Sequence, residues 1–149
     1  NPTFVGRRLT DIQFEATTRM EFSPKNENEE AGMILLNNGS HFDILVFNKG
    51  GKRYLAVKLQ FGQTIYKSKE VVLAPGFVDL KIEGNGPEFI FSYAQNNGEF
   101  KVLEKADARF LSTQTVGWFT GLYVGLYATG NGKATKAPAV YDWFEYAGK

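Results

Sequence analysis

The fold of this chain is decided by residues 14–22, FEATTRMEF, in which apolar and polar side chains alternate. A period of two places alternate side chains on opposite faces of a strand, so this stretch is typical of a strand with one buried face. One face carries Phe14, Ala16, Thr18, Met20 and Phe22, and the other carries Glu15, Thr17, Arg19 and Glu21.

The same alternation recurs along the chain, and turn residues separate its occurrences. It is found in residues 54–61, 78–83, 89–93 and 122–128, whereas residues 33–36 are continuously apolar, as in a strand covered on both faces. Turns are expected at Asn38-Gly39, Gly50-Gly51, Pro75-Gly76 and Asn96-Asn97-Gly98. No stretch of ten or more residues keeps a helical period. The sequence therefore predicts an all-β fold, an antiparallel β-sandwich, with 106–115 and 129–138 as connections.

Length and charge restrict the class of protein. The 149 residues are the usual size of one domain, and we expect residues 1–149 to form a single β-sandwich. A net charge of +1 gives no field that would favour nucleic acid or an anionic membrane, and no apolar run has transmembrane length. The chain has no cysteine and starts at Asn1 without Met, which indicates a piece of a longer protein.

Catalysis by this chain alone is not expected. His41 is the only histidine and is interpreted as a surface or hydrogen-bonded residue at the start of a strand. A sandwich glycosidase would need two carboxylates on one face, about 5–10 Å apart. Glu27, Glu29 and Glu30 precede an apolar strand and are expected in a solvated loop. Asp142 and Glu145 are three apart and are expected on opposite faces of a strand.

Two binding features remain open. Loop Asp, Glu and Asn oxygens could hold a structural calcium ion, although no ligand set can be assigned and no other cofactor is expected. The segment Gly117-Trp118-Phe119-Thr120-Gly121 places two large rings between glycines that permit a sharp turn. One ring could stack on a sugar or close a neighbour's pocket; alternatively, both rings cover the end of the sandwich.

Four blocks, in order, resemble the C-terminal domain of family 43 β-xylosidases. They are Pro2–Arg8 (PTFVGRR), Asn28–Leu36 (NEEAGMILL), Phe119–Ala128 (FTGLYVGLYA) and Asp142–Tyr146 (DWFEY). The chain departs from the family pattern at Leu9, at Val140-Tyr141 and in the 130–139 loop, which leaves open whether the parent is a xylosidase or an arabinofuranosidase.

The resemblance implies a concanavalin A-like jelly roll that works as an accessory domain in xylan degradation, a branch of carbohydrate metabolism. It also implies a partner: an N-terminal β-propeller in the same polypeptide, which carries the catalytic carboxylates of this hydrolase. By motif match, Phe119 reaches the mouth of the propeller's active site and narrows it around a short xylo-oligosaccharide. Trp118 is the neighbouring candidate for substrate contact.

Arg7 and Arg8 are candidates for the interdomain contact, because a guanidinium can fix orientation through two parallel hydrogen bonds. Alternatively, one of them pairs with a surface carboxylate of the sandwich itself. Two other functions stay open for the chain: an independent carbohydrate-binding module for xylan-type glycans, and an intact sandwich glycosidase, which lacks a recognisable carboxylate pair.

Overall fold

The computed structural model describes residues 3–8, 13–37, 40–61, 63–85, 88–107, 123–129 and 139–148. In these residues it has strands, turns and short connections, and none of them is helical. No described segment is therefore a helix that could cross a membrane.

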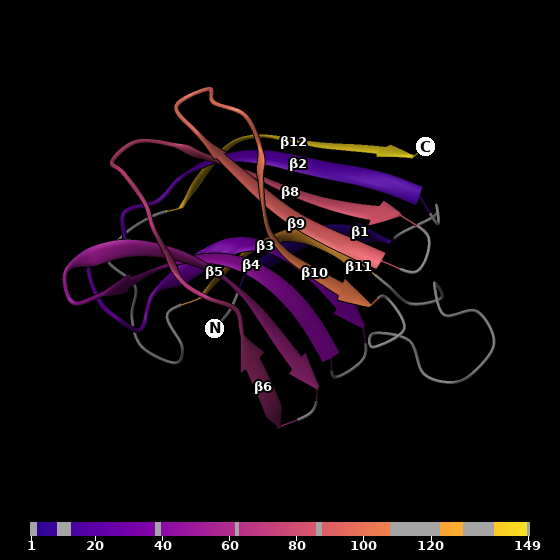
Figure 1. The fold of residues 1–149 in the computed structure, drawn as a ribbon, viewed down its shortest axis with the longest axis horizontal. Helices are drawn as coiled ribbons and strands as arrows, with labels where there is room; N and C mark the ends of the chain where they lie inside the picture. The colour runs from indigo at the N-terminus through magenta and orange to yellow at the C-terminus, as the bar shows by residue number, and fades with distance from the viewer. Residues whose placement is uncertain are drawn as a thin grey trace.

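The described strands form two antiparallel sheets, as the sequence predicted (Figure 1). The larger sheet has seven strands in the order β1 (Thr3–Arg8), β11 (Tyr123–Thr129), β3 (Glu30–Asn37), β4 (Ser40–Lys49), β5 (Lys52–Phe61) and β6 (Thr64–Lys67), with β7 (Val71–Val72) also paired to β5. The smaller sheet has five strands in the order β10 (Lys101–Asp107), β9 (Glu88–Gln95), β8 (Val78–Asn85), β2 (Gln13–Glu21) and β12 (Val140–Gly148).

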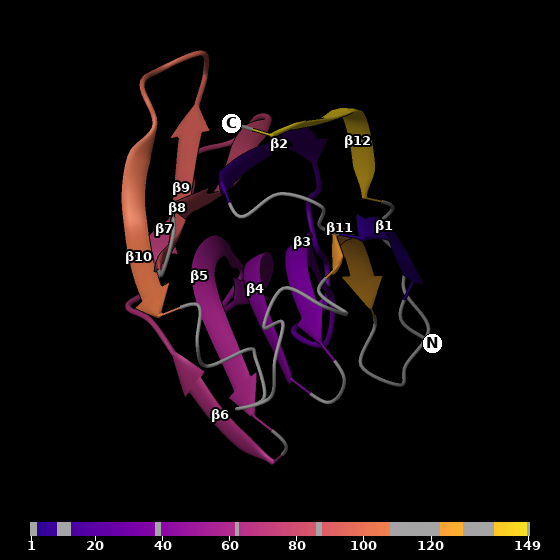
Figure 2. The same cartoon turned by 90° about the vertical axis from the view of Figure 1, so that its right-hand side faces the viewer.

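The smaller sheet arches over the larger one, and the core lies between them (Figure 2). The strand β2 has the burial pattern that its alternation predicted, since Phe14, Ala16, Thr18 and Met20 are fully buried. The Thr18 hydroxyl is satisfied there because it donates to the backbone carbonyl of Trp143 on β12, at 2.5 Å. These paired layers confirm the expected antiparallel β-sandwich.

Aromatic rings connect the two sheets inside the core. The Phe89 ring of β9 meets the Phe14 ring of β2 at 6.2 Å and the Phe42 ring of β4 at 6.1 Å, both edge to face. The centre of the Phe42 ring also lies 6.2 Å from the centre of the Phe91 ring on β9, so it contacts two rings of the smaller sheet. Phe14, Phe22, Phe42, Phe89 and Phe91 are thus used for core packing.

The expected turns at Gly50-Gly51, Pro75-Gly76 and Asn96-Asn97-Gly98 are confirmed, whereas the one expected at Asn38-Gly39 lies outside the described residues. Gly50 and Gly51 have φ of 62° and 81°, as the two-residue hairpin turn between β4 and β5 requires. Asn96 and Asn97 have φ of 53° and 61°, in a turn that the Gly98 N–H closes on the Gln95 carbonyl at 2.9 Å. Two elements differ from the sequence prediction. The strand β6 was not expected, and β10 includes the buried Ala106 and ends at Asp107, where a connection was expected.

Candidate functional site

The segment that carries Trp118 and Phe119 lies outside the described residues, but the two strands that flank it are described. They are β10, which ends at Asp107, and β11, which begins at Tyr123. Asp107 pairs with Glu88 beside the end of β8, and Tyr123 pairs with Leu36 beside the end of β3. Both flanking positions are therefore at the same end of the sandwich, toward which the arrowheads of β8 and β10 point in Figure 1.

Strand register brings a row of side chains to this end, on the outer face of the larger sheet. Tyr123 of β11 is opposite Leu36 of β3, which is opposite His41 of β4. Two residues after His41 on the same strand, Asp43 of β4 is opposite Lys58 of β5. Since side chains two apart share a face, His41 and Asp43 point to the same side.

Four residues on this face form what we call the outer-face charge network: Glu30, His41, Asp43 and Lys58. The Nδ1 atom of His41 lies 2.8 Å from each carboxylate oxygen of Asp43, whose side chain is fully buried. The Lys58 ammonium donates to the carboxylate of Glu30 at 2.9 Å, and these two side chains are only 19% and 16% exposed.

Burial and neighbouring charges shift the pKa values of Asp43 and Lys58 in the network and of Tyr127 beside it. Burial raises the pKa of the Asp43 carboxyl, and the hydrogen bond with His41 and the charges of His41 and Lys58 oppose part of that rise. Burial alone would lower the pKa of Lys58, but Glu30 and Asp43 raise it overall. Burial raises the pKa of Tyr127 on β11, and Glu30 and Asp43 raise it further. The face is thus a cluster of charges with little access to water.

Two carboxylates do lie on one face of this sheet, which the sequence did not reveal. Both are engaged: Asp43 binds His41 through its two oxygens, and Glu30 binds Lys58. A fully buried Asp43 cannot reach a sugar without rearrangement, so in this arrangement the pair orders the sheet and orients His41. Among the described residues, no group of three or more acidic or histidine side chains is placed to hold a metal ion; a structural calcium site stays a prediction.

The pH dependence of the free energy of unfolding reports whether the pKa of Asp43 is raised in the folded state. Because the pKa of Asp43 is raised in the folded state, the unfolded chain ionises this group first as pH rises. The free energy of unfolding of the wild type, measured relative to that of Asp43→Asn, should therefore fall as pH rises from about 4 through the raised pKa. The fall should be roughly 1.4 kcal/mol for each pH unit between the pKa of Asp43 in the unfolded chain and its pKa in the folded chain. Urea denaturation of both proteins from acid to neutral pH measures this difference.

A matched variant sharpens that test. His41→Phe removes the bond that holds the Asp43 pKa down, so the fall should continue to higher pH in that background. A relative stability that increases over the same interval would mean that the folded-state pKa is depressed instead.

The acidic residues before β3 and in β12 also differ from the sequence predictions. Glu29 was expected in a solvated loop, and this is wrong: it is fully buried and accepts the backbone N–H groups of Lys25 and Asn26 at 2.8 and 3.1 Å. Glu30 begins β3, and only Glu27 of the three is exposed. The bulge in β12 between Tyr141 and Trp143 interrupts the regular alternation from which Asp142 and Glu145 were placed on opposite faces.

The two arginine candidates are on β1, at the edge of the larger sheet. The backbone of Arg8 pairs with Tyr123 and that of Arg7 with Val124, so both are beside the start of β11. The exposed Arg7 guanidinium lies 4.1 Å from the centre of the Tyr146 ring of β12, a cation–π contact. No described carboxylate pairs with Arg7, and the side chain of Arg8 lies outside the described part of the chain.

The comparisons with known proteins point to one family. A family model described as the beta xylosidase C-terminal concanavalin A-like domain matches residues 1–147. The non-reducing end alpha-L-arabinofuranosidase BoGH43B of Bacteroides ovatus is 33% identical over 149 residues, covering 98% of this chain and 28% of that protein. A xylosidase/arabinosidase of Butyrivibrio fibrisolvens is 30% identical over 145 residues, covering 97% of this chain and 28% of that protein.

Solved structures agree with these matches. The structure of Bacteroides ovatus xyloglucan PUL GH43B superposes with a TM-score of 0.89 at 32% identity, covering 98% of this chain and 29% of that one. A xylan beta-1,4-xylosidase from Bacillus halodurans has a TM-score of 0.87 at 21% identity, which supports the fold alone. This chain therefore spans less than a third of the length of these relatives.

Proposed function

We propose that this chain, which belongs to the family of β-xylosidase C-terminal concanavalin A-like domains, is the non-catalytic accessory domain of a family 43 β-xylosidase or arabinofuranosidase. The whole of residues 1–149 acts as one sandwich unit in this proposal. The observation that carries it is the family match over residues 1–147, in a chain that spans only 28% of its curated relatives.

The remaining length of such relatives is where the chemistry is proposed to reside. The relatives are named as arabinofuranosidase and xylosidase/arabinosidase, and the resemblance implies that their catalytic carboxylates are on an N-terminal β-propeller. In this chain, the two outer-face carboxylates are bound by His41 and Lys58. The proposed substrate of the assembled protein is a short xylo-oligosaccharide or an arabinofuranoside.

The proposed contribution of this chain to the active site is the ring of Phe119, with Trp118 beside it. The strands that flank this segment support the proposal, because Asp107 and Tyr123 are at one end of the sandwich. Arg7 and Arg8 pair with the first residues of β11 at that same end. An interdomain contact through these arginines would therefore form close to the segment that carries the rings.

The role of Phe119 is tested in the full-length parent protein. Phe119→Ala should lower kcat/KM for xylobiose by about tenfold, or about 1.4 kcal/mol of transition-state binding, because the substrate loses an apolar wall. Steady-state kinetics on xylobiose and on an aryl arabinofuranoside measure the loss. The matched control is Phe100→Ala, which removes an exposed ring before β10, at the other end of the sandwich, and should leave kcat/KM unchanged.

The two parts of the proposal fail separately. An unchanged kcat/KM for Phe119→Ala would remove the pocket-shaping role and leave the accessory role intact. Hydrolysis of an aryl xyloside by residues 1–149 alone would instead show that the chain is itself catalytic. Calorimetry of the isolated chain with xylan oligosaccharides separates an accessory domain from an independent binding module, since only the module requires binding.

A further inference from the structure

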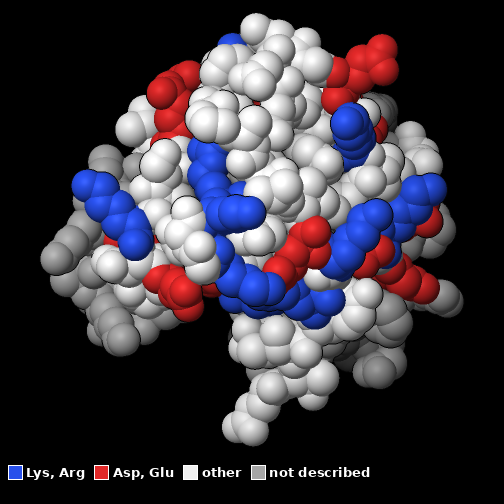
Figure 3. All heavy atoms as spheres, turned by 60° about the vertical axis from the view of Figure 1, so that its left-hand side comes forward, with Lys and Arg blue, Asp and Glu red and all other residues white. Residues whose placement is uncertain are grey.

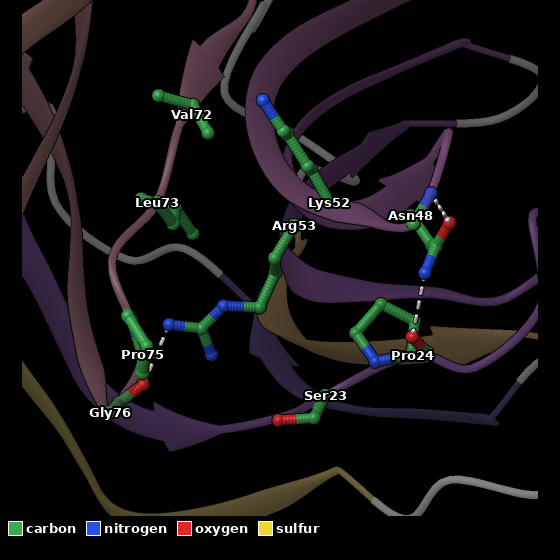
Figure 4. A pocket seen from close by; sticks show the side chains of 10 residues that line it. Ser23, Pro24, Asn48, Lys52, Arg53, Val72, Leu73, Pro75 and Gly76 are labelled. Carbon is green, nitrogen blue, oxygen red and sulfur yellow. Dashed lines mark hydrogen bonds between the residues drawn. The ribbon is translucent and has the colours of Figure 1, made fainter.

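The end of the sandwich opposite Asp107 and Tyr123 contains a cavity of about 470 Å³, which lies within the usual size range of small-molecule sites. Its lining comes from the β2–β3 connection, the β4–β5 hairpin and the segment after β7. Figure 4 shows Arg53 pointing between Gly76 and Ser23, with Lys52 directed to the other side. We call this space the Arg53 cavity.

The walls of the Arg53 cavity are held in place by hydrogen bonds from both sheets. The Arg53 guanidinium donates to the carbonyls of Phe22, Ala74 and Gly76 at 2.9, 2.5 and 2.7 Å. The side-chain amide of Gln95 on β9 also donates to the Ala74 carbonyl, at 3.1 Å. The opposite wall is joined by the Asn48 amide, which donates to the Pro24 carbonyl at 3.0 Å. A cavity with anchored walls needs little ordering when a ligand enters.

The charge of the Arg53 cavity is positive. Arg53 uses three of the five donors of a guanidinium on carbonyls, and no described carboxylate pairs with it or with the exposed Lys52. The acids nearby are already engaged: Glu27 accepts the Gly50 N–H, and Glu70 pairs with Lys49 and Lys67. Figure 3 shows Lys and Arg side chains across this side of the molecule, with Asp and Glu side chains around and between them.

The rest of the lining is apolar with a few short polar groups. Pro24, Val72, Leu73 and Pro75 supply carbon surface, and the hydroxyl of Ser23 has no hydrogen-bond partner among the described residues. An inorganic anion would meet the cations but leave this apolar surface uncovered. A ligand with a carboxylate, a ring with C–H faces and several hydroxyls would use every part of the lining.

We propose that the Arg53 cavity binds a uronic acid residue, with its carboxylate on Arg53 and its ring against Val72 and Pro75. A carboxylate accepts one of the two N–H donors of Arg53 that the carbonyls leave free, and the bond is strengthened because both groups are charged. The site does not depend on the accessory role proposed above, because it lies at the other end of the sandwich and requires no second domain.

The test uses residues 1–149 in solution and records backbone amide shifts by ¹H–¹⁵N NMR during titration. D-Glucuronate should give saturable shifts at Lys52, Val72 and Gly76, whereas methyl β-D-glucoside, which lacks the carboxylate, should give none. Lys52→Glu should weaken glucuronate binding by about tenfold or more, because it replaces an attractive charge by a repulsive one. Lys105→Glu, an equally exposed change on β10, is the matched control and should bind as the wild type does.

Three outcomes would overturn the proposal. The first is the absence of shifts with glucuronate at the Arg53 cavity. The second is equal binding of acetate or phosphate, which would make the site one for simple anions. The third is equal loss of binding in Lys52→Glu and Lys105→Glu, which would indicate general electrostatic attraction. None of these results bears on the Phe119 kinetics.

Discussion

Replacing Phe89 by alanine is expected to lower the free energy of unfolding by about 3–5 kcal/mol, the usual cost of emptying a buried phenylalanine site. Phe89 is fully buried. The centre of its ring lies 6.2 Å from the centre of the Phe14 ring in its own sheet and 6.1 Å from that of the Phe42 ring in the opposite sheet. Both edge-to-face contacts are lost together with the buried area. The change therefore weakens the cohesion of the two layers as well as that of β9.

Urea denaturation, followed by tryptophan fluorescence and by circular dichroism, measures this loss. Phe89→Leu keeps most of the apolar volume and should cost clearly less than the alanine variant. Phe100→Ala is the surface counterpart, because its ring is 38% exposed, and should cost under about 1 kcal/mol. If Phe89→Ala were no more harmful than Phe100→Ala, the ring could not be the bridge between the sheets that the structure describes.

Replacing Lys58 by methionine is expected to cost about 3–5 kcal/mol at neutral pH, because it leaves buried acidic groups without their cation. Lys58 binds Glu30 at 2.9 Å, and its charge also helps to hold down the pKa of Asp43. The folded-state pKa of Lys58 is raised, so its stabilising charge is fully present at every pH below its ordinary value. The cost should shrink in acid, where Asp43 takes up a proton.

Unfolding curves of Lys58→Met at pH 7 and at about pH 3 test this pH dependence. The matched control is Lys49→Met, since Lys49 also pairs with a glutamate, at 2.6 Å, but is 60% exposed. An exposed pair of this kind contributes about 0–1 kcal/mol, so the control should change little at either pH. A Lys58→Met cost that is equal at both pH values would contradict the electrostatic explanation and indicate lost packing of the lysine stem.

Local alternation made much of the fold predictable. Residues 14–22 show it most clearly, because one face of β2 meets the core and the other does not, and burial follows the sequence residue by residue. Turn residues such as Gly50-Gly51 and Asn96-Asn97 were equally informative, because positive φ restricts the residue types. The strand β6 has no buried face in its four residues, so no pattern marked it.

The candidate site was less accessible to sequence reasoning. Glu30, Asp43 and Lys58 are on three different strands, and their proximity depends on the register of β3, β4 and β5. An aspartate within the apolar residues 42–47 was a usable signal of a buried partner, and His41, two residues before it on the same strand face, was the local candidate that the sequence prediction missed. Glu29 was misjudged because its bonds to Lys25 and Asn26 depend on the shape of the loop.

The order in which the strands meet has a kinetic consequence. The first strands of the chain pair with the last: β1 with β11 and β2 with β12, and the bond from Thr18 to Trp143 joins residues 125 positions apart. Contacts this distant in sequence form only after a large loss of chain entropy, so refolding should take milliseconds to seconds. Until β12 arrives, β2 has an unpaired edge that can recruit another chain, so aggregation competes with folding at high concentration.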